Sequence, residues 1–178
     1  MSVMKSDLID NLFDGYRDVL GPDYDAYRNH CLRVFNFCLR LTRGKPVAEE
    51  KIAIAAFFHD IGIWTDKTLD YIVPSQEHAA AYLKKSGKAE WIDEITAMIG
   101  EHHKLSAYKE NPEWLVEAFR KSDMVDLSGG MIRFKMSDKF FNDVLEEFPY
   151  EGFHKMLLQL LVERLKTRPF NLLPMVKL

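Results

Sequence analysis

Apolar residues recur at helical spacing along most of this chain, and this periodicity constrains the fold more than any other feature of the sequence. No convincing run of residues alternates between apolar and polar, as a half-buried strand requires. The pattern therefore predicts an all-α fold. Helices are expected over residues 7–20, 23–43, 47–60, 75–85, 88–103, 112–127, 137–148 and 150–167, and an aromatic-rich loop over residues 61–74.

The length of 178 residues fits one domain with one hydrophobic core. No repeat, low-complexity tract or linker marks a boundary along the chain. We therefore expect a single domain over residues 1–178. Its central part is expected in about residues 24–127, with C-terminal helices in about residues 137–168 packed on it.

Charge and hydropathy exclude several classes of function. The 24 Lys and Arg against 27 Asp and Glu leave a net charge of −3, which offers no general attraction for extended nucleic acid or an anionic membrane. No segment approaches the roughly 20 apolar residues of a membrane span. The polar N-terminus lacks the apolar core of a signal peptide, so we expect a cytoplasmic protein.

Histidine is the informative residue type, because five of the six histidines fall where the core is expected. At about 100° per residue, His30, His59 and His102 each lie on the apolar face of their helix, and His103 lies at its edge. A lone inward histidine is usually a core residue with one hydrogen bond, and periodicity does not prove that the three converge. Several buried imidazoles need partners for both ring nitrogens, and a shared divalent metal is the common solution. The adjacent Asp60 strengthens this interpretation, because a buried carboxylate also needs a cation.

A wider pattern surrounds these residues. It consists of His30 in YRNHCLRV, His59-Asp60 in AAFFHDIG and Asp123 in KSDMVDLS. Over roughly residues 24–127 the chain thereby resembles the HD superfamily of metal-dependent phosphohydrolases. The resemblance implies an HD-type helical bundle in which these four residues bind a metal.

The resemblance also extends to a second metal. Dinuclear members of the superfamily carry further histidines between the His-Asp pair and the last Asp, where this chain has His78 and His102. The implied set is then six ligands, with Asp60 bridging two ions. His103 is the alternative to His102, although the helix-face argument favours His102.

The last aspartate of the pattern has a neighbour that competes with it. Asp126 lies nearer than Asp123 to the centre of the expected buried stripe, but Ser122-Asp123 matches the family's small residue followed by Asp. Asp123 is therefore the expected ligand. Asp126 is expected either to support a ligand by a hydrogen bond or to be a solvated carboxylate at the helix end.

The activity implied by the resemblance is phosphoester hydrolysis, phosphomonoesterase-like or nucleotidase-like, on a small phosphorylated metabolite or nucleotide. His59 and Asp60 are the implied catalytic residues, with metal-activated water as the nucleophile. The implied cofactor is one or two divalent transition metal ions, either Fe, Mn, Co, Ni or Zn, with Mg also compatible.

The substrate contacts are less defined. Many superfamily hydrolases carry a lysine soon after the His-Asp-Ile-Gly segment, where this chain has Ile63-Trp64. Candidate substrate-binding residues near the expected ligands are Arg33, Trp64, Lys67, Asp70 and Lys104. Ordinary surface charge is the favoured alternative for the three cations, and packing as a cap on the core is the favoured alternative for the aromatic residues of the loop.

Two other functions remain open at this point. The same six ligands also suit the mixed-valent diiron oxygenases of this fold, and nitrogen and oxygen donors alone do not separate the two chemistries. A non-catalytic domain that binds a metal or nucleotide is the third possibility. The expected partner is a small-molecule phosphorylated substrate, without a membrane, and the apolar C-terminal region is compatible with a homodimer.

Overall fold

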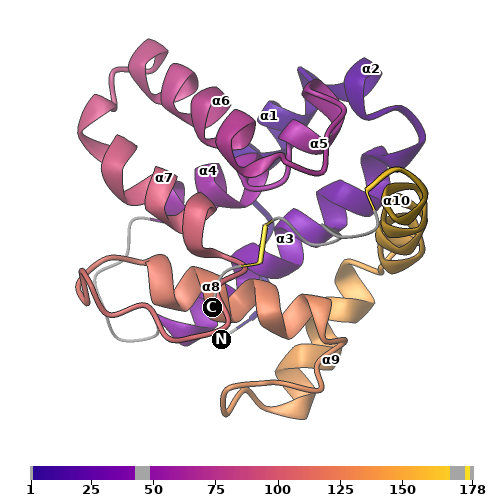
Figure 1. The fold of residues 1–178 in the computed structure, drawn as a ribbon. Coiled ribbons are helices and arrows are strands. Elements are labelled where there is room, and N and C mark those ends of the chain that lie inside the picture. The colour runs from indigo at the N-terminus through magenta and orange to yellow at the C-terminus, as the bar shows by residue number, and fades with distance from the viewer. Residues whose placement is uncertain (1, 43–48, 169–174, 177–178) are drawn as a thin grey trace.

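A computed structural model describes residues 2–42, 49–168 and 175–176 of the chain. Within these ranges it contains helices and no strand, which confirms the all-α prediction (Figure 1). The helices are α1 (Asp7–Asp14), α2 (Arg17–Leu20), α3 (Tyr24–Leu41), α4 (Glu49–Phe58), α5 (Gly62–Thr65), α6 (Ile72–Lys85), α7 (Ile92–Glu101), α8 (Val116–Leu127), α9 (Asp138–Glu147) and α10 (Phe153–Thr167), with 3-10 turns at Gly21–Asp23 and Ala89–Trp91. None of these helices is both long and apolar enough to span a bilayer.

The central element of the bundle is α3, which runs through the middle of the molecule (Figure 1). It packs against α4 and α8, and α7 in turn packs against both of those helices. The apolar residues Leu32, Val34 and Phe37 are fully buried although they point in different directions around α3. A helix that is buried all round belongs to the core of a bundle, so a polar side chain on α3 must find its partners inside the protein.

The end of α4 is held by a side chain of α3. Beyond Phe58 the chain leaves the helical path, and the Asp60 N–H donates to the Tyr27 hydroxyl at 3.3 Å. The same hydroxyl donates to the Phe57 carbonyl at 2.5 Å. Tyr27 therefore satisfies backbone groups that the helix end leaves free, and it fixes the point at which His59 and Asp60 enter the core.

The observed helices differ from the predicted ones mainly at their ends. The helix predicted over residues 7–20 is divided, because α1 ends at Gly15, whose N–H bonds back to Leu12. The predicted loop 61–74 contains α5 and the first turn of α6. Proline is tolerated in the first turn of a helix, where its missing N–H has no helical acceptor. Pro74 therefore lies inside the first turn of α6 and does not mark the start of that helix. Residue 43 and residues 47–48 of two predicted helices lie outside the described residues.

The short helix α5 is fixed by its contact with the start of α6. A side chain at Gly62 would place its Cβ 2.8 Å from the Tyr71 carbonyl oxygen and 3.1 Å from Ser75 Oγ. The Gly62 N–H also donates to Ser75 Oγ at 3.0 Å. Backbone and side chain therefore approach each other more closely here than any residue other than glycine permits.

We predict that Gly62→Ala lowers the free energy of unfolding by about 1–3 kcal/mol, because the added methyl group forces α5 away from α6. Gly15→Ala is the matched control, since φ is −73° there and the nearest atom to a new Cβ is 3.5 Å away. The control should be as stable as wild type or slightly more stable. Denaturant unfolding measures both, and equal losses in the two variants would contradict the close contact.

Candidate metal centre

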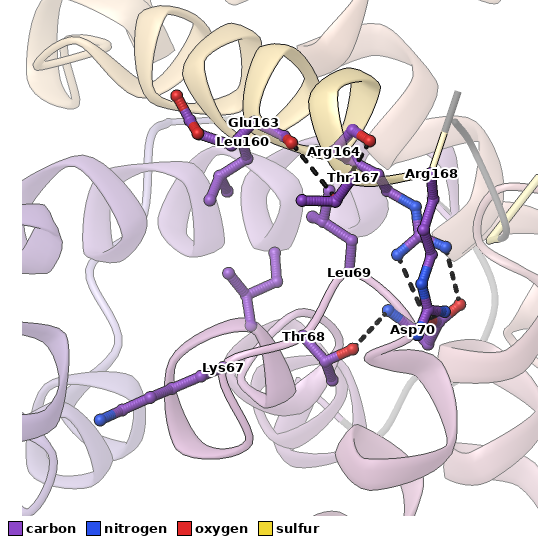
Figure 2. Close-up of a pocket in the computed structure, with 10 residues that line it drawn as sticks. Lys67, Thr68, Leu69, Asp70, Leu160, Glu163, Arg164, Thr167 and Arg168 are labelled. Atoms are coloured by element: carbon purple, nitrogen blue, oxygen red, sulfur yellow. Dashed lines mark hydrogen bonds and ion pairs between the residues drawn. The ribbon is translucent and has the colours of Figure 1, made fainter. Parts of the chain in front are cut away.

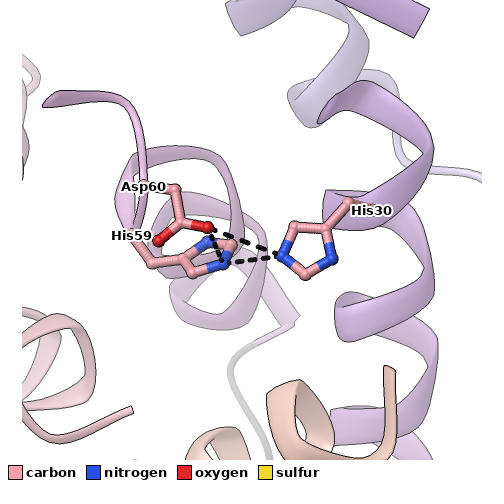
Figure 3. A group of neighbouring side chains, drawn as sticks. All are labelled: His30, His59 and Asp60. Carbon is pink, nitrogen blue, oxygen red and sulfur yellow. Dashed lines mark hydrogen bonds and ion pairs between the residues drawn. The ribbon is translucent and has the colours of Figure 1, made fainter. Parts of the chain in front are cut away.

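Five of the six predicted ligands converge in the core. His30 comes from α3, His59 and Asp60 follow α4, His102 caps the end of α7, and Asp123 comes from α8. Each of these residues is at most 4 % exposed. Figure 3 shows the ring of His30 facing His59 and Asp60 across the gap between α3 and the end of α4.

The distances within this cluster are those of ligands that share an ion. Nε2 of His30 lies 2.9 Å from Nε2 of His59, and Nε2 of His59 lies 3.3 Å from Oδ2 of Asp60. Oδ1 of Asp123 lies 3.6 Å from Nε2 of His30. Donors that each lie about 2.0–2.2 Å from one ion are separated by about 3 Å or slightly more, so the residues present fit a divalent cation.

Each histidine presents a lone pair to the centre, because its other nitrogen is already engaged. Nδ1 of His59 donates to the Ala56 carbonyl at 2.8 Å, and Nδ1 of His102 donates to the Ile99 carbonyl at 2.6 Å. A carbonyl oxygen only accepts, so both rings carry a proton on Nδ1 and turn Nε2 toward the centre. Hydrogen bonds of this kind orient imidazole ligands in metal sites.

Several atoms at the centre are buried without a hydrogen-bond partner among the described residues. These atoms are Oδ1 of Asp60, Nε2 of His102 and both carboxylate oxygens of Asp123. Unpaired polar atoms in the core are costly, and here acceptors face acceptors. A divalent cation would satisfy all of them together.

The ionisation of the cluster agrees with this interpretation. Burial lowers the pKa of His59 to about 3, so its ring is neutral at pH 7, which is the form that binds a metal. Burial raises the pKa of Asp123 to about 7. The neighbouring His102 and His30 oppose this rise only in part, and a bound cation would supply the charge that keeps the carboxylate ionised.

Arg33 needs a correction, and Asp126 takes the supporting one of its two expected roles. Arg33 is expected from the sequence to bind substrate or to lie on the surface, but it is fully buried. Its guanidinium donates hydrogen bonds to the Asp126 carboxylate, from Nε at 2.6 Å and from Nη2 at 2.9 Å. Asp126 is fully buried rather than solvated, and its Oδ2 accepts from Nδ1 of His30 at 2.6 Å. Burial opposes the ionisation of Asp126, but Arg33 lowers its pKa to about 2. The pair therefore holds the ring of His30 in place.

His78 also departs from expectation, because the structure does not bring it to the cluster. Its helix buries Ser75, Ala79 and Leu83, which leaves His78 on the flank, with a side chain that is 37 % exposed. Its Nε2 lies 2.9 Å from Oδ2 of Asp66. The expectation that His78 is a ligand is corrected by this geometry.

The histidine that takes its place is His103. Nδ1 of His103 lies 3.5 Å from Oδ2 of Asp123, its ring centroid is 3.9 Å from that of His102, and its Nε2 is 2.7 Å from the Tyr71 hydroxyl. Asp60, His102 and His103 form a second group of donors that could hold a metal. The two histidines were treated as alternatives, but both face the site because the chain leaves the helical path after Glu101.

The remaining candidates for substrate contact separate into two groups. Nε1 of Trp64 donates to Asp23 at 3.0 Å and its ring packs on Tyr27, while Lys104 pairs with Glu101 at 3.4 Å. These contacts give Trp64 and Lys104 structural partners. Lys67 and Asp70 line an outer cavity of about 430 Å³, where Asp70 binds two arginines from the end of α10 (Figure 2).

A second cavity, of about 220 Å³, lies against the cluster and beside this outer cavity. Asp60, Tyr71 and His103 form its polar end, and it shares Ile63 and Leu69 with the outer cavity. We call it the inner chamber. It is the route by which a small molecule could reach the donor atoms.

We predict that Arg33→Met lowers the free energy of unfolding by about 3–5 kcal/mol, because it leaves the buried Asp126 carboxylate without its cation. The matched control is Arg28→Met on the same helix, whose pair with Asp10 is partly exposed and should be worth less than about 1 kcal/mol. Chemical denaturation measures both losses. A small loss in both variants would show that the Arg33 pair is not structural.

The comparisons with known proteins give one match. The family model for the HD domain matches residues 27–131, a range that contains both groups of donor atoms. Searches of curated proteins and of solved structures found no match.

Proposed function

The chain belongs to the HD-domain family, and from this membership we propose that it is a metal-dependent phosphohydrolase that acts on a small phosphorylated molecule. The observation that carries the proposal is the set of buried acceptors without partners at the centre of the fold, on Asp60, His102 and Asp123. Such a cluster is costly for a protein that binds no cation. It is useful to one that holds a cation for catalysis.

Two divalent cations would be held by Asp60 and Asp123 together with two pairs of histidines. His30 and His59 lie nearest to Oδ2 of Asp60 and Oδ1 of Asp123, at 3.3–3.8 Å. On the other side, His102 lies 3.4 Å from Oδ1 of Asp60, and His103 lies 3.5 Å from Oδ2 of Asp123. Each carboxylate therefore turns one oxygen to each pair of histidines. His103 provides the donor that was expected from His78.

The reaction needs a nucleophile, charge stabilisation and a proton for the leaving group. Divalent cations would lower the pKa of a water molecule and polarise the phosphoryl oxygen. In hydrolysis the water oxygen bonds to phosphorus, the ester P–O bond breaks, and the alcohol leaves with the proton that the water gives up. Asp60 would contribute one carboxylate oxygen to each pair of histidines, and its backbone is fixed by Tyr27.

Tyr71 is the other polar side chain that reaches the reaction space. It is 2 % exposed, and burial, together with the charges of Asp60 and Asp123, raises its pKa well above the usual value. Its hydroxyl thus stays protonated at neutral pH. We assign to it the role of accepting the hydrogen bond from Nε2–H of His103, which leaves Nδ1 of His103 unprotonated, and of donating to a phosphoryl oxygen that enters the inner chamber.

We predict that the purified protein releases phosphate from small phosphate monoesters when Mn, Co, Ni, Mg or Fe is supplied. Asp60→Asn should reduce this activity to background, because it removes a charge from both metal positions. Asp66→Asn is the matched control: Asp66 is exposed, and its nearby partners are Thr65 and His78. It should retain full activity.

The assay is a phosphate-release panel run in parallel with an oxygen electrode. Loss of activity in Asp60→Asn but not in Asp66→Asn would support the proposal. Absence of phosphate release with every metal, together with oxygen consumption by the iron-loaded protein, would contradict it and assign oxygen chemistry to the site instead.

A further inference from the structure

The inner chamber is polar only at the end that meets the donor atoms. Asp60, Tyr71 and His103 line that end, and the other eight lining residues are all leucine, isoleucine, valine or methionine. Three of the leucines, at positions 157, 160 and 161, come from α10, and Leu127 closes the end of α8. A ligand that places a polar head at the donor atoms must therefore place the rest of itself against aliphatic side chains.

Cations lie outside the chamber. Among the described residues, no lysine or arginine lines it. Cationic side chains line the outer cavity instead, where Arg164 and Arg168 bind Asp70 at 3.1–3.2 Å, while Lys67 extends away from them (Figure 2). A second anionic group on the substrate would find no partner inside the chamber.

The walls also discriminate against hydroxyl-rich groups. A hydroxyl or amide that is buried without a hydrogen bond costs about 1–3 kcal/mol, so a sugar or a nucleobase would lose affinity with each such group. An aliphatic group instead binds more favourably, by about 0.8 kcal/mol of free energy for each methylene that it buries. The volume of about 220 Å³ lies below the range of about 300–1,000 Å³ that suits larger ligands, which limits the group to a few carbon atoms.

We propose that the inner chamber binds the apolar part of the substrate, and that the substrate class is phosphate monoesters of short hydrophobic alcohols rather than nucleotides or sugar phosphates. This inference rests on the proposed hydrolase function for the reaction. The binding preference follows from the walls of the chamber alone, so the two can be tested separately.

The test is a binding series with n-alkylphosphonates from ethyl to hexyl, which have no ester bond to hydrolyse, titrated calorimetrically into the manganese-loaded protein. The dissociation constant should fall about fourfold for each added methylene until the chamber is full. AMP and glucose 6-phosphate should bind more weakly than the butyl compound. A dissociation constant that does not change with chain length, or tighter binding of AMP or glucose 6-phosphate, would overturn the proposal.

Two variants locate the effect. Leu161→Trp fills the chamber and should abolish the gain for the longer chains while ethylphosphonate still binds. Leu157→Ala enlarges the chamber and should extend the gain to longer chains, and it serves if the tryptophan variant does not fold. Leu158→Trp is the matched control for Leu161→Trp. Leu158 follows Leu157 on α10, but it is 61 % exposed and does not line the chamber. A chain-length profile that is unchanged in both chamber variants would contradict the assignment.

The binding series and the phosphate-release panel together separate the two proposals. Binding that depends on chain length, without phosphate release from any ester, would support the chamber and overturn the hydrolase. Phosphate release, together with dissociation constants that do not change with chain length, would support the hydrolase and overturn the proposed binding preference of the chamber.

Discussion

Two buried carboxylates and a group of imidazoles face one another at the centre of this protein. The surrounding helices hold these side chains in place. Asp60 and Asp123 stand between His30 and His59 on one side and His102 and His103 on the other. Electrostatic repulsion and lost hydration make such a cluster unfavourable without a cation. Its cost in the metal-free protein is the physical basis of its affinity for metal.

The surrounding helices supply the rigidity that this arrangement needs. Arg33 and Asp126 form a buried ion pair that ties α3 to α8 and orients the ring of His30. Tyr27 fixes the backbone at the end of α4. Ligands held by such outer partners lose little freedom when a metal binds, so the fold acts as a scaffold whose polar interior is built before the cation arrives.

The sequence predicts the helices and the cluster well wherever periodicity or a motif applies. It fails where the decisive contact is distant or lies outside a helix. His103 follows the last residue of α7, so its direction does not follow from helical spacing. Arg33 and Asp126 are 93 residues apart, and nothing local indicates that two charged residues bury each other. Gly62 begins a short helix whose existence depends on packing against α6.

The metal content of the purified protein, loaded with manganese or iron and freed of loose ions, tests the central claim most directly. The account predicts two ions per chain in wild type and in His78→Ala, whose ring lies outside the cluster beside Asp66. It predicts fewer ions in His103→Ala, because that variant lacks one donor of the second position. A folded wild-type protein that retains no divalent metal would contradict the account.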